Sequence, residues 1–230
     1  MDYIRKANER GVVNMGWLQS NHSFSFGSYY DPQHMGVSVL RVINDDVVQP
    51  GAGFGTHGHR DVEIISYVID GALEHKDSTG NEYVVPAGEV QRMSAGRGVM
   101  HSEYNASQTE PVNFLQIWIH PNVKGIEPEY EQKRIEQDGP LTPIVTPNGD
   151  KGALRINQDA SMYRLELEKG EAYRLQTPDR QGYLHLVHGS AEINGDVFNA
   201  GDAIAPQVGK ALDVNATEKL EALWFDLPKG

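Results

Sequence analysis

Two short segments of the sequence carry side chains that can bind a metal ion. His57 and His59 stand two residues apart, and His101 and Glu103 repeat that spacing further along the chain. Residues i and i+2 of a β-strand point to the same face, so each pair can present both side chains to one point. Gly58 leaves the space between the first two histidines uncrowded. Three imidazoles and one carboxylate form a nitrogen and oxygen donor set that suits Fe(II), Mn, Co, Ni, Cu or Zn.

The composition excludes several classes of protein. The chain has 230 residues, no cysteine and a formal net charge of −12. Any metal must therefore be held by nitrogen and oxygen rather than by thiolate. No run of Lys and Arg supplies the basic surface that nucleic acid or an anionic membrane requires, and we expect neither partner. No apolar stretch approaches the roughly 20 residues of a membrane-spanning helix, and the N-terminus lacks a secretory pattern, so we expect a cytoplasmic protein.

The elements that must position these side chains are short strands. The 24 glycines and 12 prolines favour many turns. Segments rich in β-branched and aromatic residues alternate with Gly, Pro, Asn and Asp, at residues 37–42, 63–69, 113–119, 163–167, 183–187 and 220–225. The pattern predicts an all-β, mostly antiparallel fold. One candidate helix lies at residues 129–138, between two prolines.

The sequence also repeats a pair of glycine turns. The segment around Gly71 resembles the segment around Gly189, and the Ala-Gly-acid turn at Gly88 resembles the turn at Gly201. Because the two turns follow in the same order in each copy, we expect two similar β modules. We place the division near Gly139, which gives an N-terminal metal-binding domain (1–138) and a C-terminal metal-free domain (139–230).

Several phrases in the first half are similar to those of one known family. Residues 51–63 resemble the first cupin motif, and residues 98–105 resemble the end of the second. The phrases Gly-Trp-Leu at 16–18, His-Ser-Phe-Ser-Phe at 22–26 and Tyr-Tyr-Asp-Pro at 29–32 are typical of pirins. The chain thus resembles the pirin-family bicupins, most densely from residue 11 to about residue 120. This resemblance implies an all-β bicupin, with two cupin (jelly-roll) β-barrels packed face to face.

The resemblance also implies a ligand set. Pirins are known for a ligand glutamate two residues after the second-motif histidine, so the implied metal ligands are His57, His59, His101 and Glu103. They would hold one divalent transition metal, with Fe(II) as the expected ion and Ni, Cu, Co, Mn and Zn as alternatives. The usual cupin takes its carboxylate from the first motif, where Glu63 stands. If the strand is regular, Glu63 shares the face of the histidines and is a reserve ligand or an acceptor for an imidazole N–H.

The second module lacks the donors. Counted from the matching glycine turns, the three ligand histidines correspond to Leu175, Thr177 and Val214, and none of these offers an imidazole or a carboxylate. His185 and His188 are three residues apart, so a strand puts them on opposite faces. We interpret both as packing or surface residues and expect the second module to be metal-free.

The implied activity is the opening of the heterocycle of a flavonol such as quercetin by O2, with release of carbon monoxide. The metal would act as Lewis acid and template. Glu103, the only carboxylate of the implied shell, would be the catalytic base for the flavonol hydroxyl. The expected partners are a small planar aromatic substrate and O2, and we expect a monomer because each barrel covers a face of the other.

Two other functions stay open. Eukaryotic pirins are regarded as iron-bound transcriptional co-regulators, and some bacterial pirins as modulators of metabolic enzymes. The alternative is therefore an iron-binding regulatory protein that modulates a protein partner without turnover, and the net charge of −12 allows a basic partner. A cupin isomerase acting on a sugar phosphate would need several basic residues, and only Arg60, Arg92 and Arg97 stand near the site in sequence.

The remaining histidines and aromatic residues have ordinary structural explanations. Four histidines are isolated in the sequence and are interpreted as structural: His22, His34, His75 and His120. Five aromatic residues of the first segment are candidates for lining a cavity, although core packing accounts for most of them: Trp17, Phe24, Phe26, Tyr29 and Tyr30.

Overall fold

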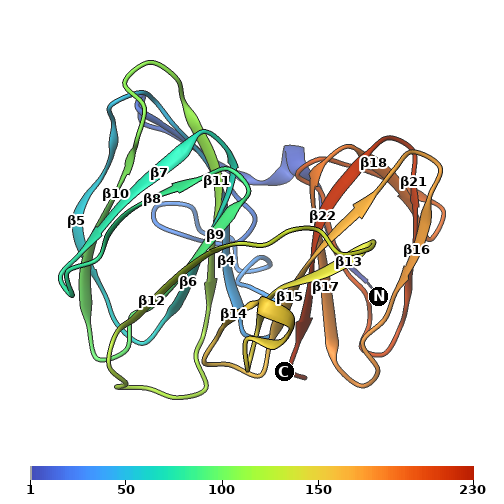
Figure 1. Ribbon diagram of the computed structural model, residues 1–230. Coiled ribbons are helices and arrows are strands. Elements are labelled where there is room, and N and C mark those ends of the chain that lie inside the picture. The colour runs from blue at the N-terminus through green and yellow to red at the C-terminus, as the bar shows by residue number, and fades with distance from the viewer. Residues whose placement is uncertain (1) are drawn as a thin grey trace.

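The computed structural model describes residues 2–230 and consists almost entirely of β-strands (Figure 1). The chain forms two β-barrels that lie side by side, each made of a seven-stranded sheet and a four-stranded sheet. Two 3-10 turns, Ala7–Glu9 and Asp150–Gly152, are the helical elements of the described residues. The prediction of an all-β fold is confirmed.

The first barrel contains strands β2 to β12, and all of its neighbouring strands pair antiparallel. Its larger sheet has the order β12-β9-β6-β11-β4-β3-β2, and its smaller sheet has the order β5-β10-β7-β8. The strands are β2 (Gly11–Asn14), β3 (Leu18–His22), β4 (Leu40–Val48), β5 (Gly53–His59), β6 (Glu63–Asp70), β7 (Ala72–Asp77), β8 (Glu82–Pro86), β9 (Glu89–Ser94), β10 (Val99–Asn105), β11 (Val112–Ile119) and β12 (Glu129–Arg134).

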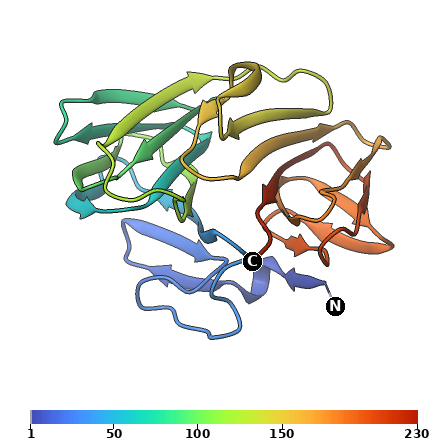
Figure 2. The same ribbon diagram turned by 90° about the horizontal axis from the view of Figure 1, so that it is seen from below.

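The second barrel contains strands β13 to β22 and also β1, from the start of the chain. Its sheets have the orders β1-β20-β17-β22-β15-β13-β14 and β16-β21-β18-β19. Figure 2 shows β1 lying against this barrel. The strands are β1 (Tyr3–Arg5), β13 (Leu141–Thr146), β14 (Leu154–Arg155), β15 (Ser161–Leu167), β16 (Ala172–Leu175), β17 (Gln181–His188), β18 (Ser190–Ile193), β19 (Asp196–Asn199), β20 (Ala203–Ala205), β21 (Leu212–Ala216) and β22 (Leu220–Leu227).

The two barrels share one topology. The run β9-β6-β11-β4 matches β20-β17-β22-β15, and β5-β10-β7-β8 matches β16-β21-β18-β19. The glycine turns that predicted a repeat occupy matching places, with φ of 77° at Gly71 and 78° at Gly189, and 84° at Gly88 and 85° at Gly201. A side chain at such positive φ is strained, which explains why glycine occurs in both copies. The predicted pair of similar modules is present in the structure.

The barrels pack through their two seven-stranded sheets, face to face as predicted. One apolar cluster spans this contact, with Ile65, Leu115 and Ile117 from the first barrel and Tyr183 and Phe225 from the second. Side chains alternate along a strand, so the same strands β4, β6 and β11 turn their other faces into the first barrel. The contact between the barrels therefore fixes which side chains face the interior of the first barrel.

The prediction of a helix at residues 129–138 is wrong. Residues Glu129–Arg134 form strand β12, which pairs antiparallel with β9. A helix of this length is marginal in water even when its residues favour it. The open edge of β9 offers backbone hydrogen bonds over six residue pairs, and this pairing outweighs the helix propensity of Glu, Gln, Lys and Arg.

Apolar side chains fill the interior of the second barrel. Leu175 and Val214, two of the positions matched to the ligand histidines, are buried in its core with Phe198 and Trp224. Thr177 lies beyond the end of β16. The strands that carry metal-binding residue types in the first barrel thus carry packing residues in the second.

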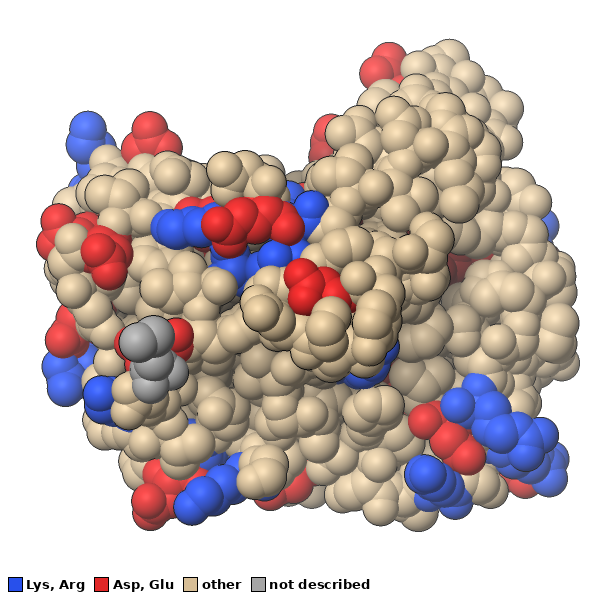
Figure 3. Space-filling view, turned by 180° about the vertical axis from the view of Figure 1, so that it is seen from behind, with Lys and Arg blue, Asp and Glu red and all other residues tan. Residues whose placement is uncertain are grey.

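Figure 3 shows the molecule from behind, where Lys and Arg side chains lie next to Asp and Glu and form no continuous basic patch on that face. Within residues 2–230, no helix combines the length and apolar character needed to cross a bilayer.

Glu63 lies between the barrels and not beside the histidines, so its predicted role as a reserve ligand or imidazole acceptor is wrong. Its Oε2 accepts hydrogen bonds from Ser94 Oγ at 2.8 Å and from the backbone N–H of Asn157 at 3.2 Å. The prediction assumed one regular strand from His57 to Glu63, on which the side chains share a face. The strand β5 ends at His59, however, and β6, which begins at Glu63, belongs to the other sheet. Glu63 instead ties the first barrel to the second.

Replacing Glu63 should weaken the fold and spare the histidine site. Glu63→Ala leaves the donors of Ser94 and Asn157 without a partner, so we expect the free energy of unfolding to fall by about 2–3 kcal/mol. Urea unfolding measures this change, and Glu136→Ala, at an exposed position, is the control. Unchanged stability together with lost metal binding would contradict this assignment.

His185 gives the second barrel a pH-dependent stability. The residue is 1% exposed on β17, and burial, followed by the nearby Arg10, lowers its pKa to about 4. An unfolded histidine has a pKa of about 6.5. The unfolded chain therefore binds more protons between these two pH values, and stability must fall as pH drops through that window.

We expect the metal-free protein to lose up to about 3 kcal/mol of stability through His185 between pH 7 and pH 4. His185→Gln removes the titrating group and should flatten this part of the profile. Urea unfolding at several pH values measures the slope. His188→Gln, at an exposed position on the same strand, should leave the slope unchanged, and an equal effect of both substitutions would contradict the assignment.

Candidate metal centre

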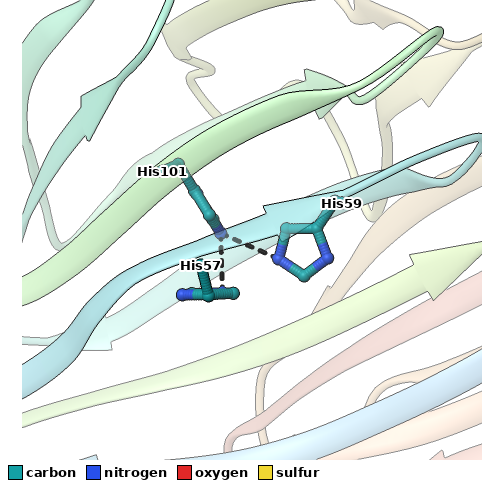
Figure 4. A group of neighbouring side chains, drawn as sticks. All are labelled: His57, His59 and His101. Atoms are coloured by element: carbon teal, nitrogen blue, oxygen red, sulfur yellow. Dashed lines mark hydrogen bonds between the residues drawn. The ribbon is translucent and has the colours of Figure 1, made fainter.

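The two histidine-bearing segments lie on neighbouring strands of the four-stranded sheet of the first barrel. His57 and His59 come from β5 and His101 from β10, and the strands pair antiparallel with His101 opposite His57. A bulge in the pairing follows, between His101 and Glu103. The three imidazoles point toward one another (Figure 4). We refer to His57, His59 and His101 as the histidine triad.

The ring nitrogens of the triad are close enough to share one ion. Nε2 of His101 lies 3.0 Å from Nε2 of His59 and 3.1 Å from Nε2 of His57. Two nitrogen ligands about 2.1 Å from one metal ion lie about 3.0 Å apart at a right angle and about 3.4 Å apart at a tetrahedral angle. The two observed distances are therefore short enough for His101 to share one ion with His57 and with His59.

Hydrogen bonding and burial keep these imidazoles in the form that binds metal. Nδ1 of His57 lies 2.8 Å from the carbonyl oxygen of Gly55, so Nδ1 is the hydrogen-bond donor and Nε2 is the ring nitrogen that faces the other histidines. Burial, followed by the neighbouring histidines, lowers the pKa of His59 to about 4 and the pKa of His101 to about 3. Both rings are neutral at neutral pH, as a ligand imidazole must be.

Glu103 stands beside the triad in a second group of donors. Ligand atoms of His75, His101 and Glu103 lie within 4.8 Å of one another, and all three residues are buried. His75 sits on β7, its Nε2 2.8 Å from Oδ2 of Asp77, and its ring stacks on Tyr130 at 4.6 Å between centroids. His75, which the sequence presents as an isolated histidine, thus belongs to the surroundings of His101.

The Glu103 carboxylate is held by side-chain donors inside the barrel. It accepts hydrogen bonds from Gln116 Nε2 at 2.6 Å, Gln91 Nε2 at 2.9 Å and Ser66 Oγ at 3.2 Å. These donors come from β11, β9 and β6, so three strands of the seven-stranded sheet fix a side chain of the four-stranded sheet. The carboxylate has a defined orientation at the inner side of the triad.

A cavity of about 510 Å³ opens beside these residues. His57, His59 and Glu103 line it, together with four aromatic side chains: Trp17, Phe26, Phe54 and Trp118. A cavity of this size with apolar walls and a few polar groups is typical of sites for small organic molecules. The ring of Trp118 lies 5.0 Å from the ring of His59, so the aromatic walls reach the triad itself.

The five aromatic candidates from the sequence divide among the cavity, the core and more exposed positions. Trp17 and Phe26 line the cavity. Phe24 packs in the apolar cluster between the barrels, and Tyr29 is held through its hydroxyl by Arg5 at 2.7 Å. Tyr30 is 73% exposed and lines nothing. Core or surface positions thus account for three of the five.

Sequence reasoning missed the residues that surround the ligand candidates. Gln91, Gln116 and Trp118 have no local motif and reach the site only because β9 and β11 flank β6 in the sheet. His75 offered one usable signal, since Asp77 follows at the same i, i+2 spacing as the other donor pairs.

Two antiparallel β-barrels, one of which carries a histidine cluster at a cavity, define the class of bicupins. Within that class the chain belongs to the pirin family: a family model described as Pirin matches residues 4–119, and one described as the quercetinase C-terminal cupin domain matches residues 143–227.

Relatives of known structure or name cover the whole chain. A protein of Escherichia coli K12 named quercetin 2,3-dioxygenase is 48% identical over 229 residues, which are 99% of each chain. The structure of the bacterial pirin YhhW from Escherichia coli in complex with nickel(II) superimposes with a TM-score of 0.96 at 48% identity and covers 100% of both chains. A quercetin 2,3-dioxygenase from Acinetobacter baumannii shares the fold, with a TM-score of 0.80 at 23% identity over 98% of this chain and 86% of that one.

Removal of a triad imidazole should abolish tight binding of a divalent metal. Because His101 Nε2 is the atom common to both short contacts, we expect His101→Ala to weaken the binding of nickel(II) by at least about 100-fold. Isothermal titration calorimetry on metal-free protein measures the affinity. His120→Ala, at an exposed position, should bind as the unchanged chain does, and tight one-site binding by His101→Ala would refute the assignment.

Proposed function

We propose that the chain is a metal-dependent dioxygenase that opens the heterocycle of a flavonol such as quercetin with O2 and releases carbon monoxide. The observation that carries this proposal is the convergence of three imidazoles beside an aromatic-walled cavity, which His57 and His59 line. The name of the E. coli relative at 48% identity over the full chain supports the choice of substrate.

The proposed metal ligands are His57, His59 and His101, with Glu103 as the fourth. Imidazole and carboxylate form the donor set of Fe(II), which we propose as the ion in the cell, and Ni, Cu, Co, Mn and Zn suit the same donors. When bound, such an ion supplies Lewis acidity toward the flavonol 3-oxygen and a point at which O2 and the substrate meet. The nickel(II) complex of the E. coli pirin supports a divalent ion in this family.

Glu103 is the proposed base that takes the proton of the flavonol 3-hydroxyl. Its carboxylate faces the cavity, and Gln91 and Gln116 orient it through bonds of 2.9 and 2.6 Å. Because these hydrogen bonds use some of the lone pairs of the carboxylate, only the remaining lone pairs can accept the proton of the substrate. The amide groups would hold the protonated carboxyl in place for the rest of the turnover.

The cavity walls account for binding a planar substrate. Trp17, Phe26 and Trp118 offer ring faces and edges to an aromatic ligand. They also exclude water from the reacting atoms.

We further propose that the protein is a cytoplasmic monomer with two domains, residues 1–138 and 139–230. Strand β1 belongs to the first of these ranges but pairs with β20 in the sheet of the second domain.

Uptake of dioxygen tests the activity directly. Metal-free protein is reloaded with Fe(II), mixed with quercetin and followed with an oxygen electrode and a carbon monoxide assay. We expect uptake and carbon monoxide in equal amounts, and a loss of at least about 100-fold in His101→Ala prepared identically. His120→Ala is the matched control.

An absence of uptake above a metal-only control, with metal still bound, would overturn the dioxygenase proposal. That result would favour the regulatory alternative, in which the metal-bound protein acts on a protein partner without turnover.

The role of Glu103 as base has its own test. Glu103→Gln keeps the size of the side chain but cannot accept the proton, so we expect kcat to fall by about 100- to 10,000-fold. Metal content and quercetin affinity, measured without O2, separate this loss from loss of the site. A variant that retains metal and turns over quercetin at the original rate would exclude Glu103 as the base.

A further inference from the structure

Four polar side chains cover one inner wall of the cavity, on strands that the proposed chemistry does not use. Ser20 and His22 lie on β3, and Asn44 and Asp46 lie on β4. All four line the cavity, and each is at most 5% exposed. We refer to these four residues as the polar wall.

Each residue of the polar wall has one buried polar atom for which residues 2–230 supply no hydrogen-bond partner of good geometry. Ser20 Oγ, His22 Nδ1, Asn44 Oδ1 and Asp46 Oδ1 are each buried without a partner. The Glu103 side of the same cavity differs, because Gln91, Gln116 and Ser66 satisfy that carboxylate. The Glu103 side of the cavity is satisfied by neighbouring side chains, whereas the polar wall presents four buried atoms that can take further hydrogen bonds.

Such a wall is costly unless a ligand uses it. A buried polar atom without a partner costs about 1–3 kcal/mol, and four of them on adjacent strands are unusual among native proteins. Burial raises the pKa of Asp46 to about 7; the Ser20 hydroxyl opposes part of this rise, and the carboxylates of Asp45 and Glu103 add to it. The fold therefore maintains a poorly solvated acid on the cavity surface at a cost to its own stability.

Strand register places the polar wall next to the proposed catalytic residues. Ser20 pairs with Asp46 and His22 with Asn44 across β3 and β4. Asn44 in turn pairs with Gln116 across β4 and β11, and Gln116 holds Glu103 at 2.6 Å. A flat ligand that reaches Glu103 in this cavity therefore has one edge along the polar wall.

We propose that the polar wall is a subsite that binds the hydroxyl groups of a polyhydroxylated aromatic ligand. The carboxyl and amide oxygens of Asp46 and Asn44 are acceptors, and Ser20 Oγ can both donate and accept. Aromatic hydroxyl groups are good donors that also accept, and a flat polyphenol presents several of them along one edge. This inference rests on the proposed function and deepens it, because it assigns substrate selection to residues remote from the metal.

The test compares two flavonols that differ in their hydroxyl groups. Quercetin carries hydroxyls on both ring systems, whereas 3-hydroxyflavone keeps only the hydroxyl at carbon 3. Binding is measured by calorimetry on nickel(II)-loaded protein without O2, so that no turnover occurs. We expect the unchanged chain to bind quercetin at least about tenfold more tightly, because a site built for hydroxyl groups rejects the analogue that lacks them.

The decisive variant is Asp46→Leu, which keeps the approximate size of the side chain and removes its acceptors. We expect its preference for quercetin to fall to within about threefold of unity, through weaker quercetin binding and unchanged 3-hydroxyflavone binding. We also expect its melting temperature to stay the same or rise, because a buried unpaired acid is removed. Asn44→Leu should also lower the preference for quercetin, and it replaces Asp46→Leu in the test if that variant does not fold.

Asp45→Asn is the matched control. Asp45 is the neighbouring acid on β4 and bonds outside the cavity, to Arg10 at 3.2 Å and Asn113 at 2.9 Å. Its replacement should leave the preference for quercetin unchanged. An equal loss of preference in this variant would show a general effect of β4 and would overturn the subsite.

The outcomes separate this proposal from the proposed function. Flavonol binding with the expected preference but no O2 uptake supports the subsite and overturns the dioxygenase. If the chain turns over quercetin and neither Asp46→Leu nor Asn44→Leu changes its preference for quercetin over 3-hydroxyflavone, the dioxygenase is supported and the subsite is overturned. The polar wall would then bind water only. Failure of the unchanged chain to bind either flavonol overturns both.

Discussion

The contact between the two seven-stranded sheets is the constraint on which the site depends. Strands β4, β6 and β11 are buried on both faces, and their outer faces supply apolar side chains such as Ile65 and Leu115 to the cluster between the barrels. A small barrel normally needs its interior for its own hydrophobic core. Here the interface provides much of that burial, so the inner faces can carry Ser66, Gln116 and Asn44 and leave space for a cavity.

Comparison of the two barrels shows how one topology supports two different interiors. The strands that carry the histidine triad in the first barrel correspond to strands with Leu175 and Val214 in the second, where apolar side chains fill the core. The second barrel therefore contributes an apolar core of its own and one side of the contact between the barrels. Glu63 connects the two roles, because it begins β6 and accepts hydrogen bonds from Ser94 of its own barrel and Asn157 of the other.

Much of the fold and the donor triad was accessible from the sequence because both depend on local rules. The i, i+2 spacing of His57 and His59 and the glycine turns at matching positions need only strand geometry and the sign of φ. The alternation rule gave the wrong place for Glu63, because the chain passes from one sheet to the other between His59 and Glu63. Residues such as Gln116 and Asp46 could not be predicted, because only non-local strand pairing gives them their neighbours.

The exchange of β1 into the second barrel has a consequence for synthesis of the chain. Tyr3–Arg5 leaves the ribosome about 200 residues ahead of its pairing partner Ala203–Ala205. At about 5–20 residues per second, the first strand waits for about 10–40 s before its partner exists. Its shortness and the charge of Arg5 limit wrong pairing during that time. The seven-stranded sheet of the second barrel is thus complete only when β1, which precedes the first barrel in sequence, has paired with β20, which follows it.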